Sequence, residues 1–105
     1  MATFNFKPQK YTNYLKEGRY TGSVEKIDFY EEKGYFAVDI RTDNAIFNTS
    51  FSTINPIFND FAFGFVDEEG NFVDDDLIGQ KVVFIVKDGA QTPELRSRVV
   101  MIKAI

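Results

Sequence analysis

Alternation of apolar and polar residues predicts three consecutive strands in the first half of the chain. It is clearest over residues 35–41 and continues over residues 45–52, and a period of two is typical of a strand with one buried face. The predicted inward side chains are those of Phe36, Val38, Ile40, Phe47, Thr49 and Phe51. A longer strand over residues 19–30 precedes them, and its register must shift near Glu25 and Lys26, which predicts a β-bulge.

Turn residues and a change of period follow these strands. Gly34 closes a predicted hairpin turn at residues 31–34, because glycine takes a positive φ without steric cost. After residue 52 the period becomes helical, with an apolar stripe of Ile54, Ile57, Phe58 and Phe61. Asn55 is the predicted N-cap of this short helix, Pro56 suits its first turn, and Gly64 is its predicted end.

Two further strands are predicted towards the C-terminus. Residues 81–86 are strand formers apart from the first, and no proline interrupts them. The side chains expected inside are Val82, Phe84 and Val86. Val83 and Ile85 give the same strand a second apolar face, so either another segment covers it or it contacts a partner. Residues 99–105 form the last predicted strand.

The chain is expected to form one domain preceded by an arm. Residues 1–16 mix aromatic and basic side chains, and Pro8 breaks regular structure there. We expect this arm to pack on the domain, residues 17–105, through Tyr14 and Leu15. The alternative is that the basic, aromatic arm touches nucleic acid.

The order of three strands, one short helix and two strands matches the five-stranded Greek-key barrel of the OB-fold. The chain also resembles the small OB-fold, single-stranded-DNA-binding-like proteins of phages and mobile elements. Those proteins open with a Gly-x-Tyr strand and close with a Leu-Ile-Gly-x-x-Val strand, a loop and an Arg-Val strand. The matching positions are Gly18, Tyr20, Leu77, Ile78, Gly79, Val82, Arg98 and Val99. The expected fold is therefore mainly β, a five-stranded OB-fold barrel with one short helix between its third and fourth strands.

The resemblance implies a non-catalytic protein that binds single-stranded nucleic acid. Bases would stack on exposed aromatic rings in a groove, and cations would follow the phosphates. The candidate stacking residues are Tyr30 and Tyr35, and the candidate phosphate-contacting residues are Lys33, Arg41, Lys87, Arg96 and Arg98.

Each of these candidates also has a purely structural interpretation. Tyr35 can cover a neighbouring strand, Arg41 can pair with Asp39 or Asp43, and the loop arginines can be solvated. The sequence also departs from the family at Val83 and Ile85, because such proteins commonly carry basic residues at outward positions of that strand.

The distribution of charge supports a second hypothesis. The formal net charge is −4, and residues 60–76 carry seven acidic residues and no cation. Such a surface suits a small acidic protein of a phage or mobile element that binds, or inhibits, a basic protein partner. The alternative is that the acidic residues form a solvated loop. The candidate interaction residues are Asp67, Glu68, Glu69, Asp74, Asp75, Asp76, Val83 and Ile85. Self-association through Val83 and Ile85, giving a homodimer, is a third hypothesis.

Composition excludes several classes of function. The chain has no cysteine and no histidine, which excludes disulfides, thiolate zinc sites and imidazole catalysis. It also lacks a glycine-rich phosphate loop and the spacing of an EF-hand, so we expect no enzyme, no cofactor and no metal. Neither a signal peptide nor an apolar run of membrane-spanning length is present, and we expect a cytoplasmic protein without a membrane partner.

Overall fold

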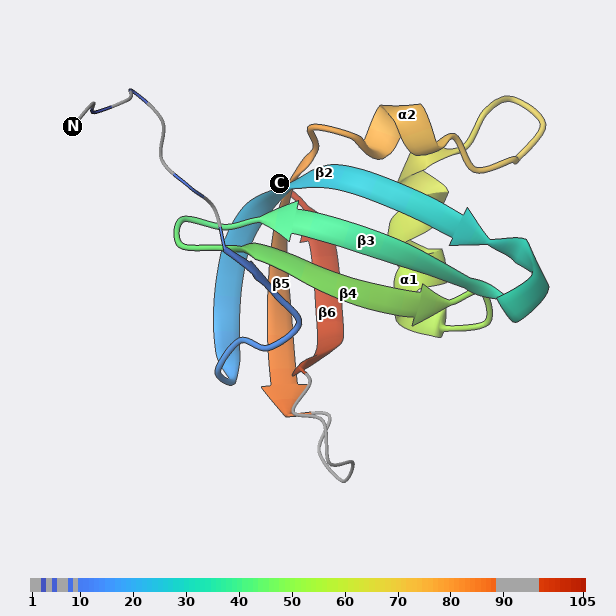
Figure 1. Cartoon of the computed structure of the whole chain (residues 1–105). Coiled ribbons are helices and arrows are strands. Elements are labelled where there is room, and N and C mark those ends of the chain that lie inside the picture. The colour runs from blue at the N-terminus through green and yellow to red at the C-terminus, as the bar shows by residue number, and fades with distance from the viewer. Residues whose placement is uncertain (1–2, 4, 6–7, 9, 89–96) are drawn as a thin grey trace.

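The computed structural model describes residues 10–88 and 97–105, together with Thr3, Asn5 and Pro8. A single six-stranded sheet, in the order β1-β4-β3-β2-β5-β6, forms most of the molecule. Its strands are β1 (Tyr11–Thr12), β2 (Gly18–Tyr30), β3 (Tyr35–Arg41), β4 (Ile46–Ser52), β5 (Lys81–Asp88) and β6 (Ser97–Ala104). The helices are α1 (Pro56–Ala62) and α2 (Asp74–Leu77), with 3-10 turns at Glu31–Lys33 and Phe63–Phe65. Figure 1 shows α1 passing behind β3 and β4.

The long strand β2 belongs to both halves of the sheet. Its first half pairs antiparallel with β5, and its second half pairs antiparallel with β3. The predicted bulge is confirmed, because the register with β3 shifts between Val24 and Lys26. Gly22 precedes this bend, where a Cβ atom would lie 2.4 Å from the carbonyl oxygen of Arg41 and 2.8 Å from Cγ2 of Ile40. Only glycine allows β2 to approach β3 this closely.

The structure differs from the predicted closed, five-stranded barrel in two respects. The sheet has six strands, and within the described residues no strand pairing joins β4 to β6. The additional strand, β1, comes from the predicted arm and runs parallel to β4, with Tyr11 opposite Ile46 and Thr12 opposite Phe47. A strand of two residues is too short to produce an alternating pattern, which is why the sequence did not predict it.

The segment after β1 reaches the other end of the sheet. The backbone N–H of Ser97 in β6 donates a hydrogen bond to the carbonyl oxygen of Asn13 at 3.0 Å. The Ser97 hydroxyl accepts from the N–H of Leu15 at 2.7 Å and donates to its carbonyl oxygen at 2.5 Å. Residues 10–15 therefore connect β4 with β6 at the place where a closed barrel would pair the two strands directly.

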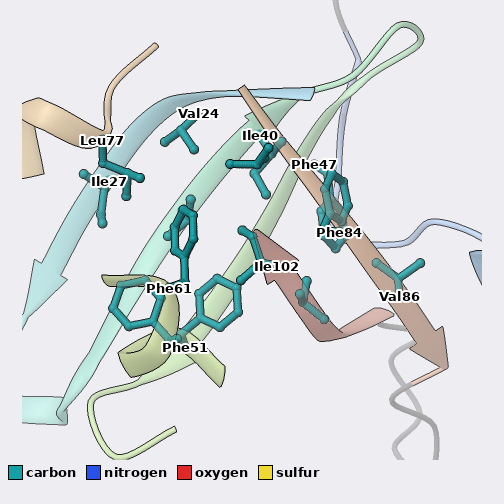
Figure 2. Close-up of a cluster of buried hydrophobic side chains, with 14 residues drawn as sticks. Val24, Ile27, Ile40, Phe47, Phe51, Phe61, Leu77, Phe84, Val86 and Ile102 are labelled. Carbon is teal, nitrogen blue, oxygen red and sulfur yellow. The ribbon is translucent and has the colours of Figure 1, made fainter. Parts of the chain in front are cut away.

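The core lies inside the curve of the sheet, and most of the predicted inward side chains are confirmed. Val82, Phe84 and Val86 are 0% exposed. The cluster takes side chains from β2 to β6 and from α1 and α2, and Figure 2 shows how they meet. The rings of Phe47 and Phe84 stack across it with centroids 5.7 Å apart. Phe36 also lies on the inward side, packed against the core although only partly buried. Ile46, which is not among the predicted inward side chains, is nevertheless 3% exposed, and it lies outside the core cluster where β1 pairs with β4.

The helix α1 begins as predicted and ends differently. The side-chain Oδ1 of Asn55 accepts a hydrogen bond from the N–H of Ile57 at 2.8 Å, and Pro56 is the first helical residue. The chain then continues into the 3-10 turn that contains Gly64, so Gly64 does not end the helix. Ile54 lies before the cap and is 86% exposed, and it is not part of the buried stripe.

The four-residue helix α2 was not predicted. Three of its residues are aspartates, which have low helix propensity, and the segment shows no apolar period. Its last residue, Leu77, is completely buried. Burial of this one side chain, which only the tertiary structure provides, attaches α2 to the core.

The substitution Gly22→Ala should lower the free energy of unfolding by about 1–3 kcal/mol, because the new methyl group must displace the backbone of β3. Urea unfolding followed by circular dichroism measures the change. Gly64→Ala is the matched control: nothing lies within 4 Å of its added Cβ, and the expected change is within about 0.5 kcal/mol. Equal stability of the two variants would contradict the close approach at Gly22.

The substitution Ser97→Ala should cost about 1–3 kcal/mol of stability, because it leaves the N–H and C=O of Leu15 without their partner. Ser50→Ala is the control, since Ser50 is exposed and should be neutral within about 0.5 kcal/mol. If Ser97→Ala unfolds at the same urea concentration as Ser50→Ala, the arm does not hold β6.

Candidate nucleic-acid interface

The predicted stacking residues lie together at the tip of the β2–β3 hairpin. Tyr30 and Tyr35 are cross-strand partners, and their rings stack on each other with centroids 4.9 Å apart. Tyr30 is 45% exposed. Lys33 lies in the turn between them, next to Glu31 and Glu32, and Gly34 closes the turn with a φ of 70°, as predicted. The tip thus offers aromatic surface with one cation beside two acids.

The outward face of β3 and β4, where an OB-fold usually binds, has its cations paired with acids. Arg41 donates a hydrogen bond from Nε to the carboxylate of Glu25, and not to Asp39 or Asp43 as the sequence suggested. On the adjacent part of β2, the Nζ of Lys26 lies 3.4 Å from the carboxylate of Asp28. These pairings leave little positive charge for a phosphate on this face.

A different face carries cations that form no ion pair with a described residue. Lys87 and Arg98 are cross-strand partners on β5 and β6. Because side chains alternate along β5 and Val82, Phe84 and Val86 point inward, the side chains of Lys81, Val83, Ile85 and Lys87 point outward. The strand register then places five exposed cations on one outer surface of β2, β5 and β6, which we name the cationic face: Arg19, Lys81, Lys87, Arg98 and Lys103.

Among the described side chains of β2, β5 and β6, none at an outward strand position of the cationic face is acidic. Glu17, directly before β2, borders this face. The strand register forms rows of neighbouring side chains across β2, β5 and β6, in that order. One row is Arg19, Ile85 and Met101, and the next is Thr21, Val83 and Lys103. Among the described residues, no ion pair joins any of the five cations to a carboxylate. The half-buried side chains of Val83, Ile85 and Met101 form an apolar strip between the cations.

The sequence therefore identified only part of this surface. It singled out Lys87 and Arg98, together with Val83 and Ile85 as interaction residues, but it missed Arg19, Lys81 and Lys103. Lys81 is in phase with Lys87 along β5, so the alternation already contained that signal. Arg19 and Lys103 join the face only through the pairing of β2 and β6 with β5. Arg96 lies outside the described residues.

The acidic stretch has partly structural roles. The Oδ1 of Asp67 accepts hydrogen bonds from the backbone N–H groups of Glu69 and Asn71, both at 2.9 Å, and thereby shapes the turn. The remaining acids predicted for a basic partner are exposed: Glu68, Glu69, Asp74, Asp75 and Asp76. In the described part of the chain, no three acids lie close enough to hold a metal ion. A basic protein partner stays a prediction.

The apolar strip also bears on self-association. Val83 and Ile85 are half-buried by their neighbours, and the five cations surround them. A two-fold dimer through this face would bring the same patch of each subunit together, and with it like charges. The homodimer stays a prediction that the charge of the face opposes.

In the ranges that the structure describes, no helix is both long and apolar enough to cross a membrane. No protein-family model, no curated protein and no solved structure matches this chain.

Proposed function

We propose that this protein binds single-stranded nucleic acid without catalysis, and that the cationic face contacts the phosphates. The observation that supports the proposal is the presence of five exposed cations on three adjacent strands, with no acid at the outward positions between them. Phosphate contacts from lysine and arginine supply most of the affinity of non-specific nucleic-acid binding. The net charge of −4 does not oppose this, because the field at a surface is local.

The apolar strip favours a single strand over a duplex. A single strand can turn its sugars and bases towards Val83, Ile85 and Met101, whereas a duplex keeps its bases stacked inside. Contacts to the flat faces of bases do not depend strongly on the nucleotide sequence, because every base has such a face. The expected ligand is thus a flexible single strand with low sequence preference along this face.

We infer that the sheet is a variant of the OB-fold in which β2 to β6 are the five barrel strands. Three features support this: the order β4-β3-β2-β5-β6, the bent first strand shared by both halves, and a helix between the third and fourth strands. In this variant, residues 10–15 lie between β4 and β6. The proposed contact surface is then β2, β5 and β6, on a different side from the usual groove over β3 and β4.

Replacing Lys87 or Lys103 by alanine should weaken binding to a labelled oligothymidylate at low salt, because each substitution removes one phosphate contact. For a single strand, each lost contact should reduce the slope of log affinity against log salt by about 0.7. Fluorescence anisotropy over a series of salt concentrations measures both quantities. Lys33→Ala is the matched control, since Lys33 is exposed but lies at the hairpin tip.

Two results would refute the proposal. One is the absence of any oligonucleotide binding by the unmodified protein at low salt. The other is an equal loss of affinity in Lys33→Ala and Lys87→Ala, which would show that the bound strand does not prefer the cationic face.

A further inference from the structure

A polar cavity of about 270 Å³ lies between β4 and β6, beside the cationic face. This volume is slightly below that of the pockets that hold drug-sized ligands. Asn48 and Ser50 of β4 line one side, and Arg98 and Val99 of β6 line the other. The cavity exists because β4 and β6 do not pair along this part of their length.

Both walls of the cavity present backbone groups that no described strand pairs. The N–H of Ile46 donates to the carbonyl oxygen of Lys10, on the side of β4 that faces away from β3. Peptide groups alternate along an antiparallel strand, so those of Asn48 and Ser50 point to this same side. The pairing of Thr12 with Phe47 in the parallel ladder occupies the N–H of Asn48. Past Thr12 no described strand accompanies β4, so the C=O of Asn48 and the N–H and C=O of Ser50 face the cavity.

The same alternation applies to β6. The N–H of Ser97 donates to the carbonyl oxygen of Asn13, away from β5, so the N–H and C=O of Val99 also point away from β5. Val99 therefore offers one donor and one acceptor from the wall opposite Asn48 and Ser50. A ligand between the walls meets hydrogen-bonding groups on two sides.

The ends of the cavity restrict the shape of its ligand. Asn13 from the arm lines the cavity beside Ser97, and Asn55, the N-cap of α1, lines it beyond the end of β4. A compact, planar group with donors and acceptors on its edges fits this space, and a nucleobase is such a group.

Arg98 connects the cavity with the cationic face. It is the cross-strand partner of Lys87 on that face, and it also lines the cavity. Its guanidinium makes no ion pair or hydrogen bond with a described residue. A phosphate bound by Lys87 and Arg98 would hold its own nucleotide at the mouth of the cavity.

We propose that this cavity takes one unstacked nucleobase of a single strand whose phosphate is held by Lys87 and Arg98. The inference rests on the proposed function and adds a binding site for one base. The cavity would contact the edges of that base, while the cationic face would bind the phosphates of the rest of the strand. A duplex cannot supply this base without unpairing it, which costs free energy. Single strands should therefore bind more tightly than duplexes of the same length.

The experiment uses a short oligonucleotide with one 2-aminopurine, whose emission rises when the base leaves the stack. The unmodified protein should raise the emission. Ser50→Leu fills the cavity; it should abolish the rise and weaken single-strand binding about tenfold. Ser52→Leu is the matched control, because Ser52 is an exposed serine on the same strand that does not line the cavity, and it should behave like the unmodified protein.

A second measurement needs no variant. Titration of the unmodified protein with thymidine monophosphate should shift the backbone amide signals of Ser50 and Val99 in nitrogen-15 NMR spectra. Shifts confined to Lys87 and Arg98 would overturn the cavity site, as would equal behaviour of Ser50→Leu and Ser52→Leu. In either case, weaker binding by Lys87→Ala would leave the proposed function standing. Absence of all oligonucleotide binding at low salt would remove both.

Discussion

The bend of β2 is the constraint on which the rest of this structure depends. One strand must pair with β5 over its first half and with β3 over its second half, and the change occurs at Gly22 and the bulge after Val24. Gly22 permits it, because its missing Cβ leaves room for the backbone of β3. The two halves of the sheet then face each other across one core, in which rings from β4 and β5 stack.

Bending the sheet brings β4 and β6 near each other without pairing them. The arm fills the gap at one end with hydrogen bonds to both strands, through Lys10, Asn13 and Leu15. The helix α1 lies at the other end, where Asn55 starts it beside the last residues of β4. Between these two closures the strand edges remain open, and the polar cavity occupies that space. Exposed strand edges are normally covered or charged. The uncovered edges of β4 and β6 beside Arg98 are therefore a distinctive feature of this fold.

The same bend separates the charges. On the outward side of β3 and the adjoining half of β2, Arg41 and Lys26 have carboxylate partners. On the outward side of β5 and the first half of β2, the cations have none among the described residues, and a group of acids lies in α2 and the turn before it. A protein with a negative net charge thereby acquires a locally positive surface, which is what a phosphate backbone requires.

Local sequence determined the strands, the bulge near Glu25, the hairpin at Gly34 and the cap at Asn55, because each depends on periodicity or on the conformational preference of one or two neighbouring residues. The inward positions of β5 followed from the same periodicity. Only the tertiary structure decided that β1 joins the sheet, that Leu77 anchors α2, and that Arg19 and Lys103 stand beside Lys87 and Arg98. These features depend on which strands become neighbours, and alternation within one strand carries no information about its partner. The cavity also depends on the tertiary structure, because it arises from two strand edges that approach each other without pairing.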